Sequence, residues 1–360
     1  MTDAARGPHE RGDDAAADTS HPTDPPGLPL EALRSFLDRE APGLLSGPLT
    51  GRVVAGGKSN LTYVVGDGVR TVVVRRPPLG HVLATAHDMV REHRVITALR
   101  DTPVPVPDTY AVCATDDVLG APFYVMEHVG GTPYRSAAQL DVLGAQRTRA
   151  VAERMIDTLV DLHGVDPDAV GLGDFGRPEG FLERQVRRWK QQLDASRSRE
   201  LPGIDDLHAR LAASVPHSGA PAVVHGDFRL DNLLVDDRDG VTAVLDWEMA
   251  TLGDPLTDVA LLEAYQSLPE IVGGNAVSDV SRAPGFPSGA ELLARYGERS
   301  GRDLSSLSFH LGLAYFKLAV ILEGIHYRYS KGQTVGEGFS RIGEATAPLV
   351  AAGLRALDRA

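Results

Sequence analysis

The spacing of hydrophobic and polar positions changes along the chain, from a pattern typical of strands to a pattern typical of helices. In the first part, short alternating or β-branched runs predict strands, because successive side chains of a strand point to opposite faces of a sheet. These runs lie within residues 52–54, 61–65, 70–75, 109–114 and 122–127. After Gly130 and Gly131, apolar residues recur at helical spacing and predict long helices at 146–163, 180–196, 258–266 and about 304–329. The pattern predicts an α+β protein in which a small β-rich lobe precedes a larger, mainly helical lobe.

Two further helices are predicted in the β-rich part, at residues 30–39 and 84–100. In the second of these, Met89, Glu92, Ile96 and Leu99 share one face. A carboxylate on an apolar face is unfavourable unless a cation pairs with it. Glu92 therefore predicts a basic partner on a neighbouring element.

Composition separates an N-terminal tail from the two lobes. The first 27 residues contain six acidic residues and, after Met1, no aromatic or large aliphatic side chain. We therefore predict a disordered acidic tail over residues 1–27, an N-lobe over 28–127 and a C-lobe over 128–360. The junction near residues 127–131 predicts a cleft between lobes, which is a favoured place for ligands.

Charge and cysteine content exclude several classes of protein. The net charge of −13 argues against a nucleic-acid partner, because binding to phosphates needs a basic surface. The single Cys113 cannot form a disulfide bond within the chain, and no Cys/His cluster has the spacing of zinc ligands, which excludes a disulfide scaffold and a structural zinc site. Without a disulfide to need an oxidising compartment, we expect a cytoplasmic protein. The apolar run at 311–325 contains Lys317 and Glu323 and is shorter than the roughly 20 residues of a membrane span. We read it as a core helix, expect no membrane association, and find no pattern that indicates a protein partner.

Candidate chemistry concentrates around a predicted hairpin. The turn-rich residues 236–240 separate two apolar runs, and we predict Val235 opposite Val241. In that register Asn232 faces position 244, and Asp246 lies at the same end. Amide and carboxylate oxygens, few in number, suit Mg²⁺ bound together with phosphate oxygens and water.

Asp227 precedes Asn232 by five residues, in a loop that follows an apolar run. Kinase catalytic loops have this spacing: the Asp accepts the proton of the acceptor hydroxyl and the Asn holds the metal. Together with Asp246, these residues resemble the aminoglycoside phosphotransferase family, and the resemblance covers about residues 50–265. It implies a two-lobed protein-kinase-like fold, with Asp227 as catalytic base, Asn232 and Asp246 as Mg²⁺ ligands and ATP as donor. Arg229 either stabilises charge on the transferred phosphoryl group or pairs with Asp231.

The same resemblance identifies residues for the nucleotide. A glycine-containing turn resembles the family's nucleotide loop and contributes Gly56, Gly57, Ser59 and Asn60. Arg75 occupies the position of the strand lysine that holds the α- and β-phosphates, and Glu92 is its helix partner. Arg76 is the alternative for that position, because only one of two neighbours in a strand faces the cleft. Glu127 and Val129 match the hinge whose backbone groups would bind adenine.

The resemblance also implies that the acceptor is a hydroxyl group of a small molecule. Only seven residues separate Asp246 from Asp254, which leaves no platform for a peptide substrate. Segments 73–78, 91–94 and 253–255 resemble the phosphotransferase domain that occurs alone in bacteria or fused to acyl-CoA dehydrogenases, which implies a hydroxyacyl-CoA. The alternatives are an aminoglycoside or macrolide kinase, whose cationic acceptor would suit an acidic protein, and a nucleotide-binding regulator without catalysis.

Other polar residues near these motifs have structural interpretations. His225 is expected to brace the loop by hydrogen bonds, and Asp254 and Asp258 to cap the following helix or bind loop backbone groups. Four basic residues between 184 and 190 form either a solvated helix face or a site for coenzyme A phosphates. The run at 326–329 either lines the acceptor pocket or ends the core helix.

Overall fold

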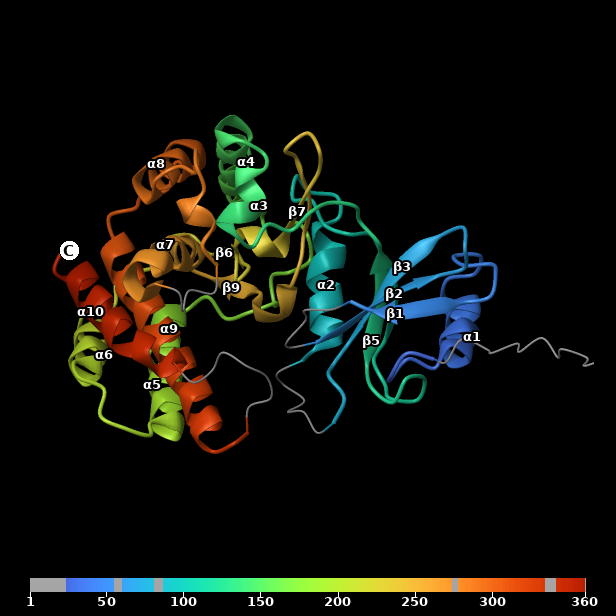
Figure 1. Cartoon of the computed structure of the whole chain (residues 1–360), viewed down its shortest axis with the longest axis horizontal. Helices are drawn as coiled ribbons and strands as arrows, with labels where there is room; N and C mark the ends of the chain where they lie inside the picture. The colour runs from blue at the N-terminus through green and yellow to red at the C-terminus, as the bar shows by residue number, and fades with distance from the viewer. Residues whose placement is uncertain (1–23, 55–59, 81–86, 274–277, 334–340, 360) are drawn as a thin grey trace, which may run out of the picture.

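The computed structural model describes residues 24–54, 60–80, 87–273, 278–333 and 341–359, and the chain forms two parts (Figure 1). One part is an antiparallel sheet flanked by two helices. The other consists of helices and two short β-ladders. The predicted α+β, two-lobed arrangement is confirmed.

The sheet has five antiparallel strands in the order β1-β2-β3-β5-β4. The strands are β1 (Thr50–Val53), β2 (Leu61–Gly66), β3 (Thr71–Arg76), β4 (Thr109–Cys113) and β5 (Phe123–Glu127). All five coincide within a few residues with the predicted runs. Burial alternates along part of β2 and β4, whereas β3 and β5 are apolar runs that are buried over most of their length.

Each face of the sheet is covered by one helix. Helix α1 (Leu30–Glu40) packs on one face, where Phe36 meets Phe123 with ring centroids 4.9 Å apart. Val72 and Val74 of β3 belong to that same core, whereas Val73 belongs to the core on the α2 face. The alternation along β3 therefore directs Arg75 to one side of the sheet and Arg76 to the other.

Packing against the sheet begins at Pro25, inside the segment that we predicted as a disordered tail ending at residue 27. Pro25 is buried, and the carbonyls of Pro26 and Gly27 accept hydrogen bonds from the Tyr63 hydroxyl at 2.6 Å and from Arg76 Nη1 at 2.6 Å. Composition indicated a polar, proline-containing segment, but it contained no signal for these backbone contacts.

Helix α2 (Met89–Leu99) lies on the face of the sheet toward the second part of the molecule. It begins at Met89, where the Asp88 side chain caps it by accepting the N–H of Arg91 at 2.9 Å, and residues 84–86 of the predicted helix lie outside the described residues. The predicted stripe of Met89, Glu92, Ile96 and Leu99 is buried, with Glu92 only 1% exposed.

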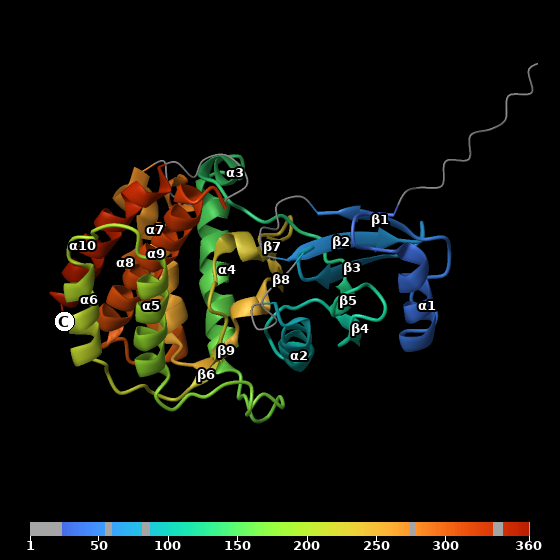
Figure 2. The same cartoon turned by 90° about the horizontal axis from the view of Figure 1, so that it is seen from below.

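The second part is mainly helical (Figure 2). Its helices are α3 (Ala137–Asp141), α4 (Ala145–Gly164), α5 (Phe181–Ser196), α6 (Ile204–Ala213), α7 (Leu256–Val272), α8 (Gly289–Ser300), α9 (Leu307–Ser330) and α10 (Thr346–Leu357). The predicted helices correspond to α4, α5, α7 and α9. The sequence analysis missed α3, α6, α8 and α10, which are shorter.

Helix α9 is the central helix of this part and packs against α5, α6, α7 and α10. Its length, and the mean hydropathy of 1.3 over its most apolar 18-residue stretch, would allow it to cross a membrane. However, 61% of that stretch is buried inside the protein. It is therefore the core helix that the sequence predicted, although it is longer than the apolar run alone indicated.

Two β-ladders lie between the helices and the sheet (Figures 1 and 2). β6 (Ala222–Val224) pairs with β9 (Thr251–Gly253), and β7 (Leu233–Val235) pairs with β8 (Val241–Val244). Val235 faces Val241 as predicted, but a bulge shifts the register so that Leu233 faces Val244. The prediction that Asn232 faces position 244 is therefore wrong by one residue: the Asn232 carbonyl accepts the N–H of Leu245 at 2.8 Å.

Candidate active site

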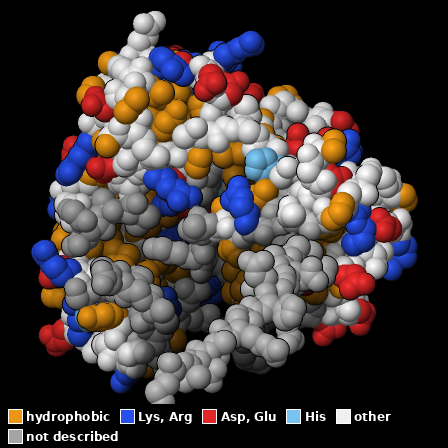
Figure 3. Space-filling view, turned by 45° about the vertical axis from the view of Figure 1, so that its right-hand side comes forward, with side chains coloured by type: hydrophobic (Ala, Val, Ile, Leu, Met, Phe, Trp, Pro, Cys, Tyr) orange, Lys and Arg blue, Asp and Glu red, His pale blue; other side chains and the backbone are white. Residues whose placement is uncertain are grey.

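A cavity of about 720 Å³ lies between the sheet and the helical part. β2, β3 and β5 supply one wall, and residues 227–232 and 244–248 supply the opposite wall. Figure 3 shows a hollow in this face of the molecule, with Lys and Arg side chains along its edge. The cavity contains most of the predicted site residues that the structure describes.

The loop of residues 225–232, called here the Asp227 loop, leaves β6 and turns sharply. Gly226 has a φ of +84°, and a Cβ at this position would lie 2.8 Å from the backbone oxygen of Met249. Only glycine meets both conditions without strain. The turn brings the Asp227 side chain to the cavity wall.

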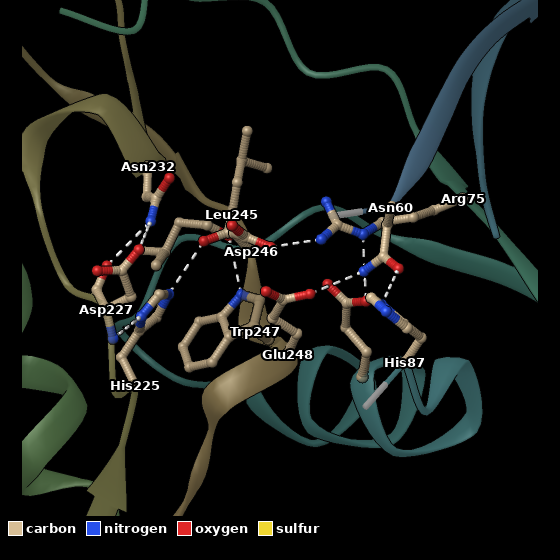
Figure 4. Close-up of polar contacts among 12 residues, drawn as sticks. Asn60, Arg75, His87, His225, Asp227, Asn232, Leu245, Asp246, Trp247 and Glu248 are labelled. Atoms are coloured by element: carbon tan, nitrogen blue, oxygen red, sulfur yellow. Dashed lines mark hydrogen bonds and ion pairs between the residues drawn. The ribbon is translucent and has the colours of Figure 1, made fainter. Parts of the chain in front are cut away.

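Buried hydrogen bonds fix the backbone of the Asp227 loop (Figure 4). The carboxylate of Asp258, on α7, accepts the N–H groups of His225 at 2.6 Å and Gly226 at 2.7 Å. His225 Nε2 pairs with the carbonyl of Leu245 at 2.9 Å, and its Nδ1 accepts the N–H of Asp227 at 3.2 Å. Burial favours the neutral form of Asp258, yet bonds from His163 and these amides hold its pKa below the usual value. His225 and Asp258 have the bracing positions predicted for them.

Asn232 and Asp246 offer oxygen atoms to the cavity from neighbouring turns (Figure 4). The Asn232 amide nitrogen donates to the Asp227 carbonyl at 2.9 Å and to Asp227 Oδ2 at 3.2 Å. That orientation leaves its amide oxygen without a hydrogen-bond partner among the described residues. Asp246 adopts a left-handed conformation with φ of +67°, which Asp and Asn tolerate better than most residues.

This pair of oxygen donors fits a hard divalent cation. Among the residues that the structure describes, no three His, Cys, Asp or Glu side chains are grouped to hold a metal ion. A cation between Asn232 and Asp246 would therefore need further oxygen ligands from a bound molecule or water, as Mg²⁺ does at phosphate-binding sites.

Arg75 lies on the opposite wall and is the basic partner that Glu92 predicted. Its Nε lies 3.2 Å from Glu92 Oε2, and its Nη2 donates to Asp246 Oδ1. Burial opposes its charge, but Glu92, Tyr124 and Asp246 hold the pKa of Arg75 above the ordinary value. Burial raises the pKa of Glu92, and the Arg75 guanidinium opposes that change. Arg75 is thus a fixed cation at the cavity wall.

Arg76 points away from the cavity, as the alternation of β3 requires. It is 5% exposed, and its Nη1 donates to the carbonyls of Gly27 at 2.6 Å and Leu119 at 2.8 Å. The choice between the two arginines, which the sequence left open, is resolved in favour of Arg75 as the cavity residue.

Arg229 also lines the cavity and pairs with Asp231, one of the two roles that the sequence left open. Its Nε lies 3.9 Å from Asp227 Oδ2, and its guanidinium lies 5.0 Å from the centre of the Tyr265 ring. The guanidinium therefore lies close to Asp227, but Asp231 already balances its charge.

The remaining predicted residues lie at the sheet side of the cavity. Asn60 donates to Glu248 Oε2 at 3.0 Å, and its amide oxygen contacts His87 Nδ1 at 2.8 Å (Figure 4). Glu127, the last residue of β5, and Val129, two residues later, also line the cavity. Gly56, Gly57 and Ser59 lie outside the described residues.

Two residues near Asp227 were missed as site residues. Tyr265, on α7, donates from its hydroxyl to Asp227 Oδ1 at 2.9 Å. Lys317, on α9, donates to the Gly226 carbonyl at 3.0 Å. Tyr265 follows Asp258 by two helical turns, and this spacing could have indicated it; the charge of Lys317 within an apolar run was the only signal for the other.

Comparison with known proteins agrees with this geometry. The sequence profile of the phosphotransferase enzyme family matches residues 50–307. Acyl-CoA dehydrogenase family member 11 of Gallus gallus is 34% identical over 338 residues, which cover 91% of this chain and 43% of that protein. The chain thus spans less than half the length of this relative.

Solved structures show the same fold. A Ralstonia eutropha protein assigned to the aminoglycoside phosphotransferases superposes with a TM-score of 0.80 at 31% identity, covering 91% of this chain and 98% of the other. An aminoglycoside phosphotransferase in ternary complex with AMP-PNP and hygromycin B has a TM-score of 0.58 at 14% identity, over 91% of this chain and 98% of that one. The second likeness bears on the fold alone, which is the kinase-like fold of these enzymes.

Proposed function

The chain belongs to the phosphotransferase enzyme family, and on that premise we propose that it transfers the γ-phosphoryl group of Mg·ATP to a hydroxyl group of a hydroxyacyl-CoA. The observation that carries the phosphoryl transfer is the placement of Asp227, Asn232 and Asp246 on one wall of a single cavity, opposite Arg75. Phosphoryl transfer needs mainly positioning and charge stabilisation, which these groups can provide.

Each side chain in the cavity has a separate role in the proposed phosphoryl transfer. Asp227 accepts the proton of the acceptor hydroxyl and orients its oxygen toward the phosphorus. Arg75, held by Glu92, binds α- and β-phosphate oxygens, for which it must leave Asp246. Asn232 and Asp246 would hold Mg²⁺, which neutralises charge on the phosphates. Glu127 and Val129 line the cavity and would bind the adenine edge through backbone groups, and Arg229 would stabilise charge on the transferred group.

The acyl-CoA acceptor is supported by the relative whose name refers to acyl-CoA, which matches 91% of this chain. Lys317 lies beside the Asp227 loop, where its charge would favour an anionic acceptor over a polycation. On α5, Arg187 and Arg188 are exposed and have no ion pair among the described residues, so they can contact the phosphates of coenzyme A. Arg184 and Lys190 are already bound to main-chain carbonyls and Asp194.

An antibiotic acceptor is the second candidate, favoured by the likeness to the Ralstonia protein. One experiment separates the possibilities: ADP release from Mg·ATP with 4-hydroxyacyl-CoAs, aminoglycosides and macrolides, each with the wild type and with Asp227→Asn. We expect release with a 4-hydroxyacyl-CoA that the substitution lowers by about 10³-fold, within the range of general base contributions. Release with an antibiotic alone would replace the acyl-CoA proposal, and nucleotide binding without any release would indicate a regulator.

A further inference from the structure

Each oxygen of the Asp227 carboxylate has its own protein donor. Oδ1 accepts the hydroxyl of Tyr265 at 2.9 Å, and Oδ2 accepts the side-chain amide of Asn232 at 3.2 Å. One donor comes from α7 and the other from the Asp227 loop itself. Together they restrict rotation of the carboxylate about its last bond.

Tyr265 is held firmly enough to act as a fixed donor. Its ring faces the Arg229 guanidinium at 5.0 Å, and Arg229 is anchored in turn by Asp231. Burial, followed by the charge of Asp227, holds the pKa of Tyr265 above its usual value, so the phenol keeps its proton at physiological pH.

The helix that carries Tyr265 also carries the main anchor of the loop. Asp258 and Tyr265 are two turns apart on one face of α7. Asp258 binds the backbone of His225 and Gly226, and Tyr265 binds the side chain of the next residue, Asp227. One rigid helix thus fixes both the path of the loop and the direction of its carboxylate.

We propose that Tyr265 is a positioning residue for phosphoryl transfer: its hydroxyl holds the Asp227 carboxylate in the orientation that receives the acceptor's proton. This inference rests on the proposed role of Asp227 as base. Tyr265 itself does not touch the reacting atoms, so its effect passes entirely through Asp227.

The test combines kinetics with structure. In Tyr265→Phe the ring and its packing remain while the donor is lost. With 4-hydroxydecanoyl-CoA as acceptor, we expect kcat to fall about 10- to 100-fold while the KM for ATP stays within about twofold. In the Asp227→Asn background the same substitution should change kcat by less than about twofold, because the two effects act through one group. Equal losses in both backgrounds, or an unchanged kcat, would overturn the proposal.

Tyr63→Phe is the matched control, since it removes another partly buried tyrosine hydroxyl bond, to Pro26 in the sheet part, far along the chain from Asp227. It should leave kcat unchanged. Crystal structures with Mg·AMP-PNP supply a readout that needs no acceptor: we expect one Asp227 rotamer in the wild type and several in Tyr265→Phe. If Asp227 keeps a single rotamer in Tyr265→Phe, the proposal is overturned, whatever the acceptor is. If Asp227 takes several rotamers in the variant but the wild type does not turn over the acyl-CoA, only the choice of acceptor is wrong.

Discussion

Arg75 and Arg76 are neighbours in β3, but we assign them different roles: Arg75 to nucleotide binding and Arg76 to the stability of the fold. Arg75 faces the cavity, Glu92 and Asp246, whereas Arg76 binds two carbonyls on the other side of the sheet. Lysine keeps the charge at either position but loses the planar fork of donors. We expect Arg75→Lys to raise the KM for ATP about tenfold with little change in stability. Arg76→Lys should lower stability by about 1–3 kcal/mol with KM unchanged. Initial-rate kinetics and urea unfolding of both variants check this, and exchanged phenotypes would contradict the assignment.

Glu92 is a buried carboxylate that pairs with the cavity-lining Arg75. It is 1% exposed and its partner is Arg75. Glu92→Gln leaves the guanidinium with a neutral neighbour in a buried site, and we expect a loss of about 3 kcal/mol in the free energy of unfolding. Glu40→Gln, in an exposed pair with Arg39, is the control and should change stability by less than about 0.5 kcal/mol. Equal effects in urea unfolding would show that Glu92 is not paired as described.

The residues that sequence alone could predict are those whose role follows from spacing along the chain. Asp227, Asn232 and Asp246 lie on one local unit of loop and hairpin, so their separation in sequence fixes their convergence. Glu92 on an apolar helix face predicted a basic partner, and the family resemblance pointed to Arg75, with Arg76 as the alternative. Tyr265 was missed because, although its spacing from Asp258 puts both on one face of α7, its contact with Asp227 depends on how α7 packs against the Asp227 loop.

At the scale of elements, the interface between α7 and α8 contains a carboxyl group, that of Glu263, which has no ion pair among the residues that the structure describes. The carboxylate of Glu263 lies against the start of α8, where a Cβ on Gly289 would come within 2.1 Å of Oε2. Burial raises the pKa of Glu263 to about 7. Because the folded chain then binds this proton more tightly than the unfolded chain, this group lowers stability as the pH rises from about 4.5 to 7.

Glu263→Gln removes that titration. We expect the variant to be more stable than the wild type at pH 8 by about 1–3 kcal/mol, and the two to be similar at pH 4.5. Thermal unfolding across this pH range measures the difference. A constant difference at every pH would show that packing, and not ionisation of Glu263, is responsible.

Long elements were predictable and short ones were not, for a physical reason. α4, α5 and α9 repeat their apolar face over several turns, whereas α6 and α10 are short and gain their stability from packing on α9. Helix α8 had a local signal in the capping box of Ser288 and Glu291, which the sequence analysis did not use. The predicted register of the hairpin was wrong by one residue, because the bulge that shifts it depends on the tertiary contacts of β7.

At the scale of the whole molecule, the cavity lies between the sheet and the helical part, so a ligand there contacts both and should stabilise both. The walls come from the sheet and from the Asp227 loop and hairpin. A ligand that binds only the folded chain at 100 times its Kd adds about 2.7 kcal/mol. We expect Mg·AMP-PNP to raise Tm by several degrees and EDTA to remove most of that increase, because Asn232 and Asp246 then have no cation to share with the phosphates.

Asp246→Asn isolates the metal-dependent part of this coupling, since asparagine tolerates the left-handed backbone at this position, where φ is +67°. The variant should bind AMP-PNP with the same Tm shift in Mg²⁺ and in EDTA. The matched control is Asp239→Asn, at the other described non-glycine residue with positive φ, in the hairpin turn and paired with Arg147. It should retain the full Mg²⁺-dependent shift. If Asp246→Asn also retained it, Asp246 would not be a metal ligand, and its contact with Arg75 would be purely structural.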